Sequence, residues 1–435
     1  MKRSGSSAPG GGPAAHQPPA RGVGGFRTSR SVQAALPRGG NAPAAAAAHA
    51  TGTKAAAAAA KAGPHGYEAE LEAAVKAVRR AGELCVAVQR KLGGLAAAER
   101  DGAQGLAGET QAKEDASPVT VADYGAQAVI SVALQRELAG RWGFSMVAEE
   151  DSADLLGDEN RGLRARITEL VNAALEGEEG LGPLSEADVL AAIDAGGSEG
   201  GHEGKHWVLD PIDGTRGFVA GRQYAIALGL LDGGEPVLGV MGCPNMPQAP
   251  MTQRDGTSAA VEGVDGAGGA GVGCIFAAVK GRGTFVGPLS EGMPKRAASV
   301  EDLRSEEAVF MESVEAKHSN HEFSGRVAKI LKVTNEPLRV DSQAKYGAIA
   351  RGDASIFMRF PPATYREKIW DHAAGAIIIQ EAGGLVSDAA GKPLDFSKGR
   401  WLDIDGGIVA APPTIHPQLI AAIAEAKQTE AQAAA

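Results

Sequence analysis

The chain has 435 residues, of which 44% are hydrophobic and 22% charged, and its net charge is −10. This composition is typical of a globular protein, and a prior of ~150 residues per domain allows two or three domains. No uninterrupted apolar run approaches the ~20 residues of a transmembrane helix, so we expect no membrane partner.

Charge is divided unevenly along the chain. Residues 1–66 contain eight Lys or Arg and no Asp or Glu, which leaves −18 on residues 67–435. Binding to nucleic acid depends on Lys and Arg side chains that neutralise phosphates, so an acidic body argues against a nucleic-acid partner. The same body is compatible with a small phosphate compound that is bound through metal ions.

Residues 1–66 consist mainly of Ala, Gly, Pro and Ser with scattered Arg. An Arg-rich, Ser-containing, acid-free N-terminus is typical of organellar transit peptides, and the compact apolar core of a secretory signal is missing. We predict a disordered transit peptide that directs the protein to the chloroplast, with the mitochondrion as the alternative. An untargeted low-complexity tail would have the same composition.

The three cysteines, Cys85, Cys243 and Cys274, are widely separated and show no CxxC spacing. This use of cysteine indicates a reducing compartment and argues against a structural zinc site. A regulatory disulfide remains an alternative.

Apolar residues recur at helical spacing from Leu71 to Leu92 and predict an amphipathic first helix, followed by a Gly- and Ala-rich loop over 93–112. Ser117-Pro118 marks a turn. A second helix is expected from Val119 to about Leu138, with Asp123 in its first turns. An acid at that place often only complements the helix dipole.

Residues 144–148 predict a short strand that three consecutive acids follow, Glu149, Glu150 and Asp151. Acids after a strand also occur in ordinary solvated loops, so this feature has two interpretations. Residues 152–205 form a polar insertion without a chemical motif, and its periodicity predicts helices near 162–175 and 185–194.

The strongest chemical motif is HWVLDPIDGTRGF, residues His206 to Phe218. An apolar strand end leads into a Pro-Ile-Asp-Gly turn that carries Asp210 and Asp213, with Thr215 just beyond. Two carboxylates, the carbonyl of Ile212 and a hydroxyl group can therefore converge, and such oxygens are the ligands that Mg²⁺ prefers. The alternative is an Asp-rich turn whose side chains bond to their own backbone.

Elements after this motif alternate between strands and helices. Residues 224–231 and 236–241 predict a hairpin, and strands are expected at 275–280 and 283–286. We predict an α+β metal-binding domain over 67–296 and an α/β nucleotide-binding domain over 297–435. The second domain is expected to contain a helix near 320–332, a strand over 354–359 and a helix over 369–382.

Three ordered motifs resemble those of a known phosphatase superfamily: VAEEDS at 147–152, HWVLDPIDGTRGF, and IWDHAAGAIIIQEAGG at 369–384. The superfamily is lithium-sensitive and magnesium-dependent, and it includes inositol monophosphatase and fructose-1,6-bisphosphatase. The resemblance spans about residues 70 to 425. It implies an α/β chain with the layered αβαβα fold of the sugar phosphatases.

Within the superfamily, the phrases SPVTVADYGAQA, KHSNH and DSQAKY are similar to those of the 3′(2′),5′-bisphosphate nucleotidases. That group converts adenosine 3′,5′-bisphosphate to AMP and phosphate and also acts on 3′-phosphoadenylyl sulfate. The resemblance therefore implies a phosphoric monoester hydrolase with a small nucleotide substrate, which we expect to act as a monomer. An inositol polyphosphate 1-phosphatase on the same scaffold and an inactive nucleotide-binding sensor are the alternatives.

The resemblance also assigns roles to residues. Two or three Mg²⁺ ions would be held by Glu149, Asp210, the carbonyl of Ile212, Asp213 and Asp371. Asp123 and Thr215 would orient and deprotonate the attacking water, and Glu150 would orient a water or a ligand. The nucleotide would be bound by Thr215, His318, Ser342, Lys345, Arg359 and Asp371. One departure is Ala148 before the two glutamates, where the family usually has Gly.

Overall fold

The computed structural model describes residues 66–100, 110–112, 118–251, 271–314, 321–362 and 364–434, all within one compact unit, Ala62–Ala435. Apart from Gly66, the predicted transit peptide lies outside these described residues, as does His318. No described helix combines the length and the apolarity that a bilayer crossing would need.

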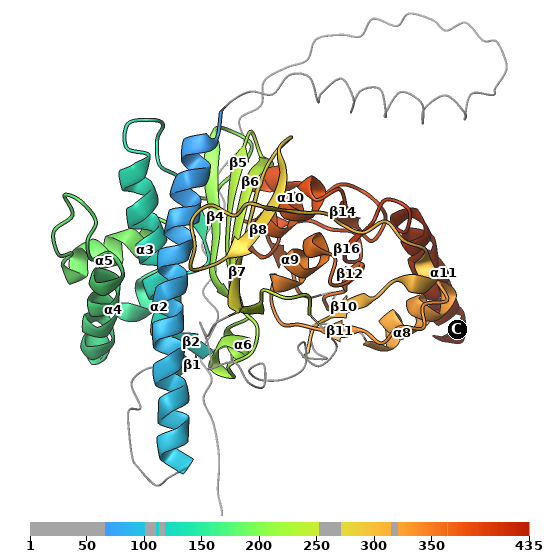
Figure 1. Ribbon diagram of the computed structural model, residues 1–435, viewed down its shortest axis with the longest axis horizontal. Coiled ribbons are helices and arrows are strands. Elements are labelled where there is room, and N and C mark those ends of the chain that lie inside the picture. Colours follow the sequence, from blue (N-terminus) through green and yellow to red (C-terminus); the bar gives the residue numbers. More distant parts are fainter. Residues whose placement is uncertain are drawn as a thin grey trace, which may run out of the picture. The chain divides into compact units, whose positions relative to one another are not determined.

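A seven-stranded sheet with the strand order β3-β4-β5-β6-β7-β8-β9 forms the first half of this unit (Figure 1). All neighbouring strands in it are antiparallel except β3 and β4, which are parallel. The predicted hairpin is confirmed as β5 and β6. The strands are β3 (Met146–Ala148), β4 (Lys205–Asp213), β5 (Ala225–Asp232), β6 (Glu235–Pro247), β7 (Val272–Val279), β8 (Gly283–Pro288) and β9 (Arg296–Ala298).

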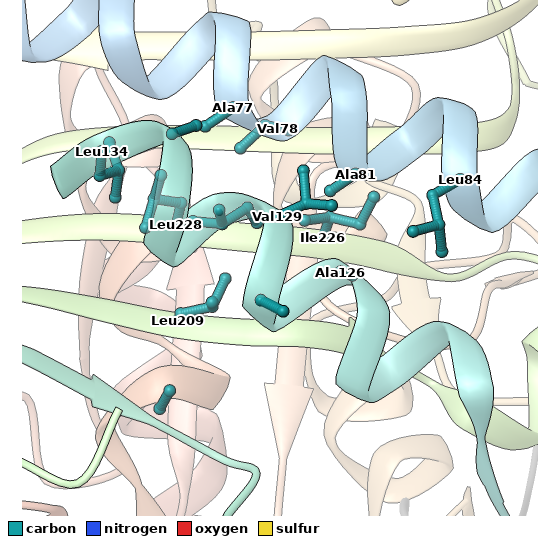
Figure 2. Packing of buried hydrophobic residues seen from close by; sticks show 14 of the residues in the cluster. Ala77, Val78, Ala81, Leu84, Ala126, Val129, Leu134, Leu209, Ile226 and Leu228 are labelled. Atoms are coloured by element: carbon teal, nitrogen blue, oxygen red, sulfur yellow. The ribbon is translucent and has the colours of Figure 1, made fainter. Parts of the chain in front are cut away.

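Helices α2 (Glu68–Arg100) and α3 (Val121–Glu137) cover one face of this sheet. Figure 2 shows small and branched side chains of α2 facing α3 and the strands, with Leu209 of β4 and Ile226 of β5 beneath them. Alanines on α2 let the helices approach closely, and burial of such apolar side chains is the main stabilising term of this layer. The predicted insertion helices are α4 (Arg161–Ala174) and α5 (Glu186–Asp194), and both pack against α3.

The first helix is longer than the sequence pattern predicts. It continues to Arg100, where we expected a loop from residue 93. The segment Leu95 to Arg100 reads LAAAER, and these residues have high helix propensity, which offsets the cost of about 1 kcal/mol for each of two preceding glycines. A short ladder of β1 (Thr110–Ala112) and β2 (Pro118–Thr120) follows.

A five-stranded sheet with the order β11-β10-β12-β16-β14 forms the second half. Between the two sheets lie α9 (Ala344–Arg351) and α10 (Ala373–Glu381), and the outer face carries α8 (His321–Ile330) and α11 (His416–Ala434) (Figure 1). The layers alternate as helix, sheet, helix, sheet and helix, which confirms the predicted αβαβα fold. The strands are β10 (Phe310–Glu312), β11 (Leu338–Arg339), β12 (Ile356–Arg359), β14 (Leu385–Asp388) and β16 (Ile408–Ala411).

The central helix layer packs directly on the first sheet. A Cβ added to Gly239 of β6 would lie 2.5 Å from Ile377 Cγ2 and 2.7 Å from the Ala374 carbonyl oxygen, so only glycine allows α10 to come this close. This contact holds the segment that precedes α10 against the ends of the strands.

The predicted helix over 369–382 is wrong in one respect, because it is interrupted. A 3-10 turn, η5 (Ile369–Asp371), ends at His372, whose φ of −139° is not helical, and α10 starts at Ala373. The imidazole of His372 is hydrogen-bonded to two buried side chains, which holds the backbone out of helical geometry. The interruption separates Asp371 from the regular helix.

Two further elements lie near this turn. A two-stranded ladder joins β13 (Glu367–Lys368) to β15 (Trp401–Leu402), and a short helix, α6 (Thr215–Val219), follows β4. The domain boundary predicted between residues 296 and 297 stays a prediction; strand β9 lies across that position.

Candidate active site

The carboxylates of the central motif are arranged by a β-bulge. Asp210 of β4 pairs with Ala227 and Asp213 pairs with Ala225, so two residues of β4 oppose the single residue Ile226 of β5. On a regular strand, side chains three residues apart point to opposite faces, and an additional residue reverses this alternation. The bulge therefore directs Asp210 and Asp213 to the same side, where both line one cavity.

The turn after β4 is closely packed against the loop 341–343. Gly214 has a φ of +89°, and a Cβ on it would lie 2.8 Å from Ser342 Cβ. Ser342 itself adopts a φ of +69°, which is uncommon for a residue with a side chain. The amide of Gln343 donates a 2.6 Å hydrogen bond to Asp213 Oδ2. The loop 341–343 thus holds the carboxylate of Asp213, a predicted metal ligand from the central motif.

A cavity of about 620 Å³ lies at these strand ends. Ala148 ends β3, so Glu149 faces this cavity from the neighbouring strand. The structure brings together nine of the predicted site residues in its lining: Glu149, Asp210, Ile212, Asp213, Thr215, Ser342, Lys345, Arg359 and Asp371. Asp123 is buried in the first turn of α3 outside this lining, and His318 lies outside the described residues.

Asp210 is the most deeply buried of the lining carboxylates. Only 2% of the residue is exposed, and its Oδ1 has no hydrogen-bond partner in the structure. Burial raises the pKa of Asp210 well above its usual range, and the charges of Glu149, Asp213, Asp371 and Asp123 add to this effect. A buried carboxylate oxygen without a donor and with anionic neighbours is a site that a cation would stabilise.

Asp371 faces Asp210 from the 3-10 turn η5. Burial raises the pKa of Asp371 to about 7, although the charges of Arg359 and His372 oppose this rise. Arg359 Nη2 lies 3.9 Å from Asp371 Oδ2, and the hydroxyl of Tyr365 donates to the same oxygen over 3.4 Å. Asp371 thus has cationic, neutral and anionic neighbours.

Glu367 organises a buried network that the sequence analysis missed. Its Oε1 accepts a 2.6 Å hydrogen bond from Arg359 Nε, and its Oε2 lies 3.1 Å from His372 Nε2. The hydroxyl of Tyr346 lies 2.8 Å from His372 Nδ1 and completes the chain of contacts. Burial alone would raise the pKa of the Glu367 carboxyl. The hydrogen bonds and charges of His372 and Arg359 outweigh this effect and lower the pKa to about 2. Glu367 lies on a strand of two residues, which is too short for a periodic signal.

Within the described part of the chain, one group of three metal-type donors converges: atoms of Glu367, Asp371 and His372 lie within 4.8 Å of one another. Both oxygens of Glu367 already face Arg359 and His372. We therefore interpret this group as an ion-pair network that orients Arg359 and Asp371. The carboxylates that face the cavity are spaced more widely, which suits ions that keep part of their water shell.

Lys345 is a cationic residue of the cavity lining. Its residue is 5% exposed, and Nζ donates to Ser313 Oγ and to the Val340 carbonyl oxygen, both over 3.2 Å. Burial lowers the pKa of Lys345 to about 8, and the charge of Asp213 opposes this shift. The cavity lining therefore contains cationic side chains as well as carboxylates.

Thr215 begins α6, and its hydroxyl donates to the Ile212 carbonyl oxygen over 3.4 Å. The hydrogen bond from Thr215 to Asp123 that the family resemblance implies stays a prediction. The charge of Asp123 nevertheless reaches the site, because it contributes to the raised pKa of Asp210.

A second residue that the sequence analysis missed holds the loop after β3. Gln127 of α3 is fully buried, its Nε2 donates to the carbonyl oxygen of Glu150 over 2.6 Å, and its Oε1 accepts from the Glu150 amide over 3.1 Å. The reciprocal pair fixes the backbone directly after Glu149. Its sequence signal is a polar residue within the mainly apolar run from Gly125 to Leu134.

The donor set fits hard divalent cations. Carboxylates and one backbone carbonyl line the cavity, cysteine is not among its lining residues, and Asp210 Oδ1 is buried without a donor. Oxygen donors of this kind suit Mg²⁺ rather than softer metals.

Comparison with known proteins gives consistent matches over this region. A family model described as the inositol monophosphatase family matches residues 70–428. An Arabidopsis thaliana protein named 3′(2′),5′-bisphosphate nucleotidase 1 is 49% identical over 374 residues, which cover 85% of this chain and 99% of that protein. An Oryza sativa protein named 3′(2′),5′-bisphosphate nucleotidase is 47% identical over 371 residues, 85% of this chain and 97% of that protein. A protein of the latter name from Emericella nidulans is 44% identical over 326 residues, 72% of this chain and 90% of that protein.

Proposed function

This chain belongs to the inositol monophosphatase family, and on that premise we propose that it is a Mg²⁺-dependent 3′(2′),5′-bisphosphate nucleotidase. It hydrolyses the 3′-phosphate of adenosine 3′,5′-bisphosphate and also accepts 3′-phosphoadenylyl sulfate. Water supplies the oxygen that becomes bonded to phosphorus, the ester P–O bond breaks, and the leaving 3′-oxygen takes a proton, which yields AMP and inorganic phosphate. The observation that carries the proposal is one cavity whose lining contains carboxylates together with the cationic side chains of Lys345 and Arg359.

The carboxylates and the Ile212 carbonyl of the cavity lining are the proposed metal site. Two or three Mg²⁺ ions would be held by Glu149, Asp210, the carbonyl of Ile212, Asp213 and Asp371. When bound, the ions neutralise charge on the transferring phosphoryl group and make water more acidic. The β-bulge and the Gln127 side chain fix the backbone at these ligands, and the Gln343 amide holds the carboxylate of Asp213.

Asp123 and Thr215 are the proposed pair that accepts the proton of the attacking water. A threonine hydroxyl is a poor base alone, whereas a hydroxyl hydrogen-bonded to a carboxylate can pass a proton to it. Asp123 is 2% exposed, and its charge acts on the neighbouring carboxylate of Asp210.

The cationic residues Lys345 and Arg359 of the cavity lining form the proposed site for the uncleaved 5′-phosphate. Lys345 provides a point charge, and Arg359, oriented by Glu367, presents its remaining guanidinium nitrogens. Ser342 and His318 are further proposed contacts of the nucleotide.

Phosphate release tests the proposed function. We expect purified protein with Mg²⁺ to release phosphate from adenosine 3′,5′-bisphosphate much faster than from inositol 1,4-bisphosphate. A preference for the inositol ester would identify an inositol polyphosphate 1-phosphatase instead. We expect Asp210→Asn to lose at least about 10²-fold in kcat, as is usual when one preorganised electrostatic group is removed. Nucleotide binding without turnover in the wild type would indicate a sensor.

Lithium inhibition is part of the proposal, since Li⁺ is a hard cation that competes for oxygen ligands. We expect millimolar Li⁺ to lower the turnover, and the same concentration of K⁺ to serve as the ionic-strength control. Unchanged turnover in millimolar Li⁺ would contradict the proposed lithium inhibition.

We also propose that residues 1–66 direct the protein to the chloroplast and that the mature protein is a monomer. The acid-free, Arg-containing composition of this segment supports the first point. A fluorescent protein fused behind residues 1–66 distinguishes chloroplast, mitochondrial and cytosolic locations, and light scattering of the purified chain measures its mass in solution.

A further inference from the structure

Arg400 lies beside the turn that carries Asp371. It directly precedes β15, whose residues Trp401 and Leu402 pair with Lys368 and Glu367 of β13. The ladder continues by one hydrogen bond, in which the Ile369 amide donates to the Arg400 carbonyl oxygen over 3.1 Å. The backbone of Arg400 is therefore fixed relative to η5, two residues before Asp371.

The guanidinium group of Arg400 reaches across to the other half of the site. Its Nη2 donates to the Ala148 carbonyl oxygen over 2.6 Å, and its Nη1 donates to the carbonyl oxygens of Ser198 and Gly196 over 2.9 and 3.3 Å. Ala148 is the last residue of β3 and directly precedes Glu149. All three acceptors are backbone carbonyl oxygens, so the Arg400 side chain fixes the position of the backbone at these residues.

The same guanidinium group lies over the indole ring of Trp370, with Cζ 4.9 Å from the ring centroid. Trp370 directly precedes Asp371. One half-buried side chain thus contacts the residue before Glu149 and the residue before Asp371, although these two acids are 222 positions apart in the sequence. Only the planar, forked guanidinium can stack on a ring while it donates to several carbonyls.

The segment at the end of the 152–205 insertion completes this contact. The Ala148 amide donates to the Gly196 carbonyl oxygen over 2.9 Å, and the Ser198 amide donates to the Met146 carbonyl oxygen over 3.0 Å. Gly399, with a φ of +91°, lies against Glu199, since a Cβ there would be 2.9 Å from the Glu199 carbonyl oxygen. Residues 196–199 are therefore held between β3 and the segment of Arg400.

We propose that Arg400 is a positioning residue that sets the separation of Glu149 and Asp371 and thereby the affinity of the site for divalent cations. This inference rests on the proposed roles of Glu149 and Asp371 as metal ligands. Arg400 acts through backbone geometry and ring stacking, and its charge alone is not sufficient. A lysine keeps the charge and the aliphatic stem but cannot donate to three carbonyls and stack at the same time.

The test measures binding of Mn²⁺ alone, without substrate, by the electron paramagnetic resonance signal of the free ion. We expect Arg400→Lys and Arg400→Ala to bind Mn²⁺ about 10-fold more weakly than the wild type, the size of effect usual for residues that orient metal ligands. The Mg²⁺ concentration for half-maximal phosphate release should rise by a similar factor. Metal-free thermal unfolding of each variant identifies the temperature at which all are folded.

Arg366 provides a matched control. It also lies beside the β13–β15 ladder and over a tryptophan ring, that of Trp401, with Cζ 5.4 Å from the centroid. Its ion pair with Asp403 is exposed and contacts neither ligand segment. Arg366→Ala should therefore bind Mn²⁺ like the wild type. An equal loss in Arg366→Ala, or wild-type affinity in Arg400→Lys, would overturn the positioning role.

Two reference variants separate this inference from the proposed function. Loss of Mn²⁺ binding in Glu149→Gln and Asp371→Asn together with wild-type binding in Arg400→Lys would overturn only the role of Arg400. Wild-type binding in Glu149→Gln and Asp371→Asn would overturn the ligand assignment itself, and the inference with it. If Arg400→Ala does not fold, the test uses Arg400→Lys, because this substitution removes the guanidinium contacts and keeps the positive charge.

Discussion

The amide of Gln343 and the carboxylate of Asp213 form a 2.6 Å hydrogen bond between segments that are 130 residues apart. Asp213 ends β4, and Gln343 precedes α9. Because Ser342 next to it adopts a positive φ, the loop has little freedom to follow a displaced Asp213. A proposed metal ligand and the proposed nucleotide loop are therefore expected to respond together to mutation.

Gly214 provides a direct test of this coupling. Gly214→Ala places a Cβ 2.8 Å from Ser342 Cβ and also strains a backbone with a φ of +89°. We expect a loss of about 1–2 kcal/mol in unfolding free energy and a fall in turnover on the order of 10²-fold from the displaced loop.

The control for that variant is Gly221→Ala, whose φ of +70° is similar but whose added Cβ would meet nothing within 4 Å. Chemical unfolding should show a loss of stability in both variants, larger in Gly214→Ala because its Cβ also meets Ser342, whereas phosphate release should fall only in Gly214→Ala. Equal activity in the two variants would argue against the coupling.

Asp210→Asn should separate stability from activity. In the metal-free protein the charge of Asp210 is opposed by burial and by neighbouring carboxylates, and an amide of the same shape removes that charge. We expect the variant to be more stable than the wild type in EDTA, by roughly 1 kcal/mol, as is common when a strained functional group is neutralised. Mg²⁺ should raise the unfolding temperature of the wild type more than that of the variant. A metal-free variant less stable than the wild type would contradict this account.

Glu367→Gln tests the buried network. The substitution removes the counter-charge of Arg359, and loss of one partner of a buried ion pair costs about 3 kcal/mol in unfolding free energy. We also expect KM for the bisphosphate to rise, because Arg359 loses the contact that orients it.

Glu307 offers the comparison for this substitution, since it pairs with Arg304 on the surface. Glu307→Gln should leave both the unfolding free energy and KM nearly unchanged, because exposed ion pairs contribute little to stability. An unchanged KM in a folded Glu367→Gln protein would show that Arg359 is oriented by other contacts.

His416 should make stability depend on pH at a place far from the cavity lining. Its Nε2 lies 2.8 Å from Ser387 Oγ, and burial lowers the pKa of His416 below 6.5. The unfolded chain therefore takes up a proton near pH 6.5 that the folded protein resists, so this group reduces the unfolding free energy as pH falls below about 6.5. Urea unfolding at pH 7.5 and 5.5 should show a larger loss in the wild type than in His416→Gln. Equal losses would exclude this contribution.

The sequence by itself determined the local elements and the chemical inventory of this protein. Periodicity located α3, α4, α5 and the β5–β6 hairpin, since side-chain spacing depends only on near neighbours. The ordered acidic motifs were sufficient to identify the family, because the types and order of residues are properties of the chain alone.

Tertiary structure decided how those motifs meet. The β-bulge that turns Asp210 and Asp213 to one side, the interruption at His372 and the buried network around Glu367 all depend on contacts between separate elements. The contacts of Arg400 with Ala148 and Trp370 likewise have no local signal. Packing between two sheets, rather than near-neighbour preference, sets these geometries, because only the folded layers bring such distant residues within hydrogen-bond distance.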